Sequence, residues 1–205
     1  MSKWSQFRRE VFGEPYMVWH DGADFTNVAR RYAEDPDRVL ALLKLGIGKN
    51  DEVAAQACRH LDPSPEQVPL IVDMLEAALP RSSGSARVDI AASLHAIGAS
   101  RHSTEELAQE ICSVLQSRRS WGVRLDAAIR LAEFAPTTRL VEAASAGVRD
   151  KEYLVRFHSA NTLMRWAGWD HEVWKDEELF SLIKSDAAPA QWARAADQLA
   201  AAVKL

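Results

Sequence analysis

The chain has 205 residues, of which 47% are hydrophobic and 26% are charged, and its net charge is -4. This length and composition are typical of one folded domain with a continuous core, and they exclude an intrinsically disordered chain. The net negative charge argues against a general affinity for nucleic acids. No apolar run reaches the roughly 18 residues of a membrane span, and the first ten residues do not resemble a signal peptide. We therefore expect a cytoplasmic protein.

The first 36 residues differ from the rest of the chain and are expected to form an irregular N-terminal cap. Residues 13–22 combine Gly, Pro and aromatic side chains, which predicts an irregular segment. Residues 25–34 predict a short helix capped by Asp24. A cap over the exposed end of a stacked array is the role that we favour, and a partner-binding arm is the alternative.

Three residues of this region are of types that bind metal ions: His20, Asp21 and Asp24. Such a group in a loop is common by chance, and no second cluster completes a coordination shell. The dipeptide His171-Glu172 lacks a second His four residues after His171, so the zinc-protease pattern is absent. We therefore predict no metal and no cofactor.

From residue 37 onward one pattern recurs, in which a first residue is followed by small residues four and five positions later. The five first residues are Val53, Val88, Val123, Val155 and Gln191, and they are separated by 35, 35, 32 and 36 residues. At about 100° per residue the repeated positions share one stripe, so each copy predicts an amphipathic helix. Small residues allow a neighbouring helix to approach closely, as a stacked array requires.

A second set of helices is predicted between these copies, over residues 37–46, 65–79, 103–117, 137–148 and 176–185. Several of them begin with N-terminal capping residues, such as Ser103 with Glu106, and Asp176. No segment alternates between polar and apolar residues as a strand does. The sequence therefore predicts an all-α fold of about five helical hairpins.

The segment from Gly147 to Arg156, followed by Ser159, Ala160 and Leu163, resembles the Asp-turn-Val-Arg signature of HEAT repeats. The resemblance covers residues 37–200 and implies a short right-handed α-solenoid. On this interpretation residues 1–205 are a single HEAT-like domain, with the cap over 1–36 and the stacked hairpins over 37–205.

The same resemblance implies roles for individual residues. In HEAT repeats the Asp and the Arg form a polar ladder along the turns between helices, so Asp150 and Arg156 would take these roles. Val123-Arg124 matches the Val-Arg part of the signature. Pro69 resembles the proline often found in the first HEAT helix; in a helix that begins near Ser64, it would predict a kink.

No catalytic constellation is found in the sequence. Cys58 and Cys112 lie on apolar helical faces and are expected to be buried and reduced. The segment Gly46-Ile47-Gly48-Lys49 lacks the spacing of a phosphate-binding loop and follows a predicted helix rather than a strand. We therefore predict a protein without enzymatic activity.

A partner-binding surface is predicted on the second helix of each hairpin, which is the helix that carries the repeated pattern. In HEAT-like stacks these second helices line the concave side. The candidate residues are His95, Asp126, Arg130, His158, Arg165 and Trp166. Apolar residues flanked by His and Arg form a plausible recognition patch. The leading hypothesis is a monomeric module that binds another protein, and a bacterial immunity protein that neutralises a cognate toxin is its narrower form.

The main alternative is a DNA-binding repair protein that resembles the HEAT-like alkylpurine DNA glycosylases. Asp126, Arg130, Arg165 and Trp166 are of the residue types that those enzymes use, whereas the net acidity argues against duplex binding. A chromophore carrier that resembles the bilin lyases is a third analogy, based on the fold alone.

Four of the seven tryptophans lie late in the chain: Trp166, Trp169, Trp174 and Trp192. We favour a hydrophobic cap that closes the last hairpins, and an aromatic anchor for a partner is the alternative.

Overall fold

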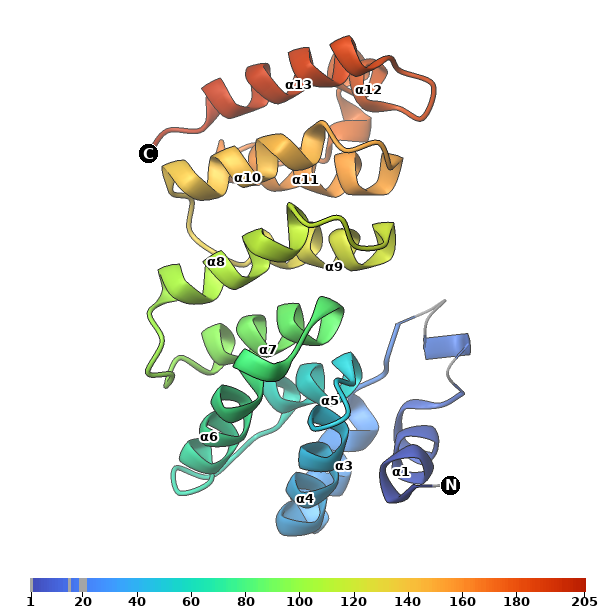
Figure 1. The fold of residues 1–205 in the computed structure, drawn as a ribbon, viewed down its shortest axis with the longest axis vertical. Coiled ribbons are helices and arrows are strands. Elements are labelled where there is room, and N and C mark those ends of the chain that lie inside the picture. The colour runs from blue at the N-terminus through green and yellow to red at the C-terminus, as the bar shows by residue number, and fades with distance from the viewer. Residues whose placement is uncertain (1, 15, 19–21) are drawn as a thin grey trace. The chain divides into compact units, whose positions relative to one another are not determined.

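The computed structural model describes residues 2–14, 16–18 and 22–205, and these residues form helices and connecting turns without any strand (Figure 1). The all-α prediction is therefore confirmed. The chain divides into two compact units, Met1–Ser103 (unit 1) and Thr104–Leu205 (unit 2). Over the described residues, no helix combines the length and the apolar character that crossing a membrane requires.

Leaving residues 15–21 out of the count, the described part of unit 1 contains six α-helices and two short 3-10 turns. These are α1 (Lys3–Phe12), α3 (Thr26–Glu34), α4 (Pro36–Ile47), α5 (Glu52–Ala57), η1 (Cys58–His60), α6 (Val68–Ala78), η2 (Leu79–Arg81) and α7 (Gly84–Ile97). Helix α5 packs against α4 and α7, and α3 packs on α4. The Ser93 hydroxyl of α7 donates to the Ala55 carbonyl of α5 (2.9 Å), which shows how closely these two helices approach.

Helix α1 is an element that the repeat spacing did not predict. Trp4, Phe7 and Val11 are buried along one face, at the spacing of a helix that packs on the fold. The Asp51 carboxylate accepts a hydrogen bond from the Trp4 indole N–H (3.0 Å) and pairs with Arg8 (3.0 Å). The same carboxylate caps α5, so one acidic side chain both starts a helix and holds α1 in place.

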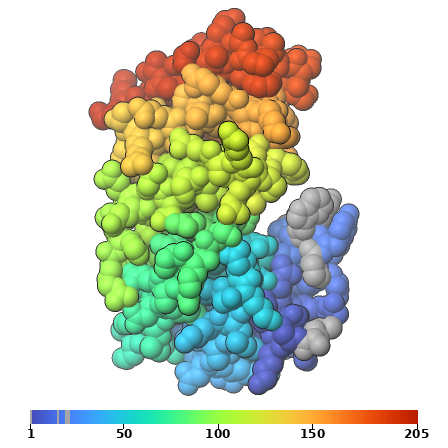
Figure 2. Space-filling model, in the orientation of Figure 1, coloured from blue at the N-terminus to red at the C-terminus, as the bar shows by residue number. Residues whose placement is uncertain are grey.

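Unit 2 contains six α-helices and one 3-10 turn. These are α8 (Thr104–Leu115), α9 (Trp121–Leu131), α10 (Thr138–Val148), α11 (Tyr153–Trp166), η3 (Val173–Lys175), α12 (Glu177–Ile183) and α13 (Pro189–Ala202). Figure 1 shows the pairs α8–α9, α10–α11 and α12–α13 in successive layers, and Figure 2 shows these layers in close contact. Helix α13 packs against both α10 and α11.

The helices predicted between the copies of the pattern are α4, α6, α8, α10 and α12, which are the first helices of the hairpins. The helices that carry the pattern are the second helices, α5, α7, α9, α11 and α13. The residues four and five positions after each first residue of the pattern are no more than 2% exposed. The observed boundaries differ from the predicted ranges by one to three residues, and the largest difference is at α6, which begins at Val68 and not at residue 65. Pro69 therefore lies in the first helical turn, where its missing N–H breaks no hydrogen bond, and the predicted kink is wrong.

Both cysteines are buried and free, as predicted. Burial raises the pKa of Cys58 to about 12 and that of Cys112 to about 11. The thiols therefore remain protonated at neutral pH and are poor nucleophiles.

Candidate partner-binding surface

Helices α9 and α11 pack against each other in unit 2. Their small residues Ala127, Ala128, Ser159 and Ala160 are at most 1% exposed. The Thr162 hydroxyl of α11 donates to the carbonyl of Ala128 on α9 (3.3 Å). Because the small residues point into this packed layer, the opposite sides of both helices face outward.

The outward residues of the two helices form what we call the α9–α11 face. It consists of Asp126, Ile129, Leu154, His158, Asn161 and Arg165, with Trp121 and Arg130 at its two edges, half a turn apart around α9. The members on α11 follow one another at i, i+4, i+7 and i+11, which is the spacing of one helix side. Asp126 and His158 occupy the same repeat position, as do Ile129 and Asn161, so the stripes of the two helices lie on the same side of unit 2.

Three apolar side chains of this face are exposed to solvent. Trp121 is 44% exposed, Leu154 is 40% exposed and Ile129 is 39% exposed. Single exposed apolar residues are ordinary, but several on two adjacent helices are typical of an interaction surface. The predicted set of site residues contained none of these three.

Five of the six predicted site residues lie in unit 2, and His95 lies in unit 1, half-buried in the last turn of α7. Asp126 and Arg130 are half-buried on α9. The Arg130 guanidinium pairs with Glu133 (3.0 Å). Arg165 is exposed near the end of α11. The structure thus places Asp126, His158 and Arg165 on one face, with Arg130 at its edge.

His158 and Trp166 are both half-buried and take part in packing. Burial lowers the pKa of His158, and the nearby Glu172 carboxylate only partly opposes this shift. His158 is therefore neutral at neutral pH. The Trp166 indole N–H donates to the Phe134 carbonyl (2.8 Å), so its polar edge is engaged within the unit.

Asp150 and Arg156, the ladder residues suggested by the HEAT resemblance, each bind groups of a neighbouring hairpin. The Asp150 carboxylate is held by two hydrogen bonds from Arg124 of the preceding hairpin, at 2.7 and 2.8 Å. Arg156 instead donates to backbone carbonyls of two turns, including those of Asp150 and Ile183 (both 2.9 Å). Both arginines therefore connect successive layers of unit 2.

The Asp150–Arg124 pair predicts how stability depends on pH. Desolvation, the largest single influence, raises the pKa of Asp150. The hydrogen bonds from Arg124 and from the Glu152 backbone N–H together outweigh it, so the pKa lies below 3.8. Because the folded-state pKa is depressed, the stabilisation is present above about pH 3.8 and is lost as the pH falls through the folded-state value.

We therefore expect the free energy of unfolding to differ most between the wild type and Asp150→Asn at neutral pH. The gap should narrow below pH 3.8, because the wild-type carboxyl then becomes neutral as well. Urea unfolding of both proteins between pH 7 and 2.5 measures this gap. A gap that stays constant over this range would contradict the assignment.

No group of three or more His, Cys, Asp or Glu side chains suited to a metal ion lies within the described ranges 2–14, 16–18 and 22–205. His20 and Asp21 of the sequence-based metal candidate lie outside the described residues. Asp24, its third member, accepts a hydrogen bond from the Thr26 backbone N–H (2.9 Å). The N-cap position of α3 is Phe25, however, and not Asp24 as predicted, because the helix begins one residue later than expected.

No family model, no curated protein and no solved structure matches this chain.

Proposed function

We propose that this chain is a non-catalytic module that binds another protein through the second helices of its hairpins, centred on the α9–α11 face. The observation that carries this proposal is the exposure of Trp121, Ile129 and Leu154 beside charged residues on two adjacent helices. Binding interfaces combine apolar anchors with a polar rim, and Trp and Arg dominate their energetics. In its narrower form, the module is a bacterial immunity protein that occludes a cognate toxin.

The geometry favours protein binding over the alternative DNA glycosylase function. That alternative needs Arg130 and Trp166 to contact DNA, yet Arg130 pairs with Glu133 and the Trp166 N–H is bonded to a backbone carbonyl. The exposed members of the face are largely apolar, whereas duplex binding depends on many Lys and Arg contacts to phosphate.

Affinity capture from the native source, with nuclease added at moderate salt, tests the proposal. We expect one stoichiometric protein partner whose binding survives nuclease. Recovery of nucleic acid, or loss of the captured material with nuclease, would favour the DNA-binding alternative.

Variants of the face should weaken the captured complex. We expect Ile129→Glu and Leu154→Glu each to raise the dissociation constant by about tenfold or more, because a buried charge replaces an apolar contact. Both residues are partly exposed, so we expect the free energy of unfolding to change by less than about 1 kcal/mol.

Leu70→Glu provides the matched control for these variants. Leu70 is 59% exposed on α6 of unit 1, outside the face, so the same change should leave the affinity unaltered. If all three variants weakened the complex equally, the α9–α11 face would not be the binding surface.

A further inference from the structure

Two neighbouring turns of unit 2 carry exposed cations where helices α9 and α11 begin. Residues 116–120 connect α8 to α9 and include Arg118 and Arg119, and residues 149–152 connect α10 to α11 and include Lys151. Figure 1 shows both turns on the same side of unit 2. We call the exposed side chains of Arg118, Arg119 and Lys151 the basic edge.

The two turns are joined by a network of buried arginines. The Arg124 guanidinium donates to the Asp150 carboxylate of the second turn (2.7 and 2.8 Å) and to the Arg119 carbonyl of the first. Arg156 donates to the carbonyls of Asp150 and Lys151 (both 2.9 Å). Arg124 is 7% exposed and Arg156 is 1% exposed. Because the backbone of both turns is held in this way, a ligand that binds there orders little additional chain.

The acidic side chains of the two turns are balanced by the same buried arginines. Asp150 is paired with Arg124 through two hydrogen bonds. The Glu152 carboxylate, half-buried at the start of α11, interacts electrostatically with both Arg124 and Arg156. Two carboxylates therefore face two guanidinium groups, and these four side chains have no net charge.

The basic edge is consequently an excess of positive charge. Its three side chains are exposed, and none forms an ion pair with a residue that the structure describes. The neighbouring cations are paired instead, Arg149 with Asp197 and Lys184 with Asp186 (3.5 Å). The potential at this edge therefore favours a partner group of negative charge.

Exposed apolar side chains lie directly beside these cations. Trp121 is the first residue of α9 and is 44% exposed, and Leu154 is the second residue of α11 and is 40% exposed. A nucleic-acid duplex would bind through many phosphate contacts and would leave both apolar side chains unused. A protein segment can contact the cations and the apolar side chains together, as the rims and anchors of protein interfaces do.

We propose that the basic edge, with Trp121 and Leu154, binds an acidic segment of the partner protein. Carboxylates of that segment pair with the two arginines, which bind them by charge-assisted and often bidentate hydrogen bonds, and with Lys151. An apolar side chain between the carboxylates packs on Trp121 and Leu154. This inference rests on the proposed protein-binding function and adds the charge of the segment that is recognised.

Two blocked peptides test the inference on the full chain labelled with 15N. One has the sequence Gly-Glu-Phe-Glu-Gly and the other has Lys in place of both Glu residues. We expect the acidic peptide to shift the indole N–H signal of Trp121, assigned with Trp121→Phe, and the basic peptide to leave it unchanged. The double variant Arg118→Gln with Arg119→Gln should weaken the acidic peptide by about tenfold or more.

The double variant Arg139→Gln with Lys204→Gln is the matched control, because it removes the same charge elsewhere. Both residues are exposed, one in the first turn of α10 and the other beyond the end of α13. This protein should bind the acidic peptide as the wild type does. Equal affinities of the two double variants would overturn the inference, as would a stronger response to the basic peptide.

A short DNA duplex at the same salt concentration tests the other class of polyanion. We expect it to leave the Trp121 signal unchanged. If the duplex shifts this signal at lower concentrations than the acidic peptide, and Arg118→Gln with Arg119→Gln abolishes the shift, the edge binds nucleic acid and the inference is wrong.

The captured complex separates this inference from the proposed function. If Ile129→Glu weakens capture while Arg118→Gln with Arg119→Gln does not, the protein-binding function stands and the role of the basic edge is wrong. If the acidic peptide binds through the two arginines but no protein is captured, the edge is an acidic-peptide site and the proposed function is wrong.

Discussion

Replacing Arg156 with methionine should lower the free energy of unfolding of unit 2 by about 3 to 5 kcal/mol. Arg156 is 1% exposed, and its planar cation lies 4.1 Å from the centroid of the Trp192 ring. The guanidinium donates to four backbone carbonyls at 2.9 to 3.0 Å, those of Asp150, Lys151, Ile183 and Lys184. Methionine fills the space of the aliphatic stem but leaves these buried acceptors without a donor.

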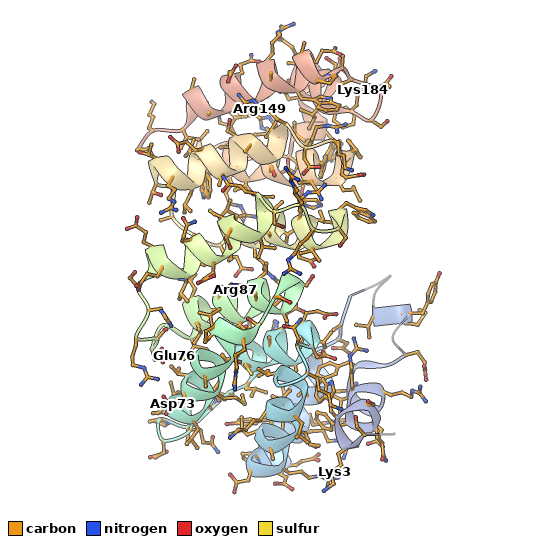
Figure 3. The ribbon with its side chains drawn as sticks, viewed as in Figure 1. Lys3, Asp73, Glu76, Arg87, Arg149 and Lys184 are labelled. Carbon is orange, nitrogen blue, oxygen red and sulfur yellow. The ribbon has the colours of Figure 1, made fainter. Side chains whose placement is uncertain are left out.

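Urea unfolding followed by circular dichroism measures the loss, and Arg165→Met is the matched control. Arg165 is an exposed arginine on the same helix, so its replacement should change the free energy of unfolding by no more than about 0.5 kcal/mol. Arg156→Lys should recover less than half of the loss, because an ammonium cannot reproduce the fork of donors that reaches two turns. Figure 3 shows Lys184 in the upper of these turns, beyond α12. Equal effects of Arg156→Met and Arg165→Met would show that the carbonyls are satisfied without Arg156.

Gly147→Ala should destabilise unit 2 by about 2 to 3 kcal/mol, although alanine is the better helix former. A Cβ atom on Gly147 would lie 2.2 Å from the Ser159 Oγ and 2.9 Å from the Ser159 Cβ. Ser159 is itself 1% exposed, so it has no room to move aside. The new methyl group therefore forces α10 and α11 apart.

Gly122→Ala is the matched control for this variant. Nothing lies within 4 Å of a Cβ atom at Gly122, which is also helical. Alanine there should stabilise the protein by about 0.5 to 1 kcal/mol. The double variant Gly147→Ala with Ser159→Gly should regain part of the loss, because it removes both clashing atoms. Thermal unfolding of the four proteins would refute the steric argument if the two alanine variants behaved alike.

The helices of this protein could be predicted well from the sequence, for a local reason. Each helix of the repeat is encoded by the spacing of its own residues. Small residues such as Ala128 and Ser159 mark the side on which a neighbouring helix can approach closely. Both features are properties of short segments. Helix α1 could not be recognised from the repeat spacing, because Trp4, Phe7 and Val11 form a helical stripe outside it.

The partners of the buried polar groups were decided by tertiary structure. The sequence indicated that Asp150 and Arg156 are structural, but it could not show that Arg124 pairs with Asp150. The pairing depends on the distance between successive turns, which the packing of α10 on α11 sets. A similar case is Glu76 in unit 1, labelled in Figure 3 with Asp73. Glu76 accepts hydrogen bonds from Ser100 and Arg101, about 25 residues farther along the chain.

The sequence by itself determined which residues lie on the outer side of their own helix, and the tertiary structure decided which of them are exposed to solvent. Leu94 and Ile129 occupy the same repeat position, yet Leu94 is fully buried and Ile129 is 39% exposed. Among the late tryptophans, the Trp166 indole N–H bonds to a carbonyl within unit 2, whereas Trp174 is 53% exposed. Periodicity gives the direction of a side chain on its own helix. Exposure depends on whatever other segments pack there, and these are separated in sequence by tens of residues.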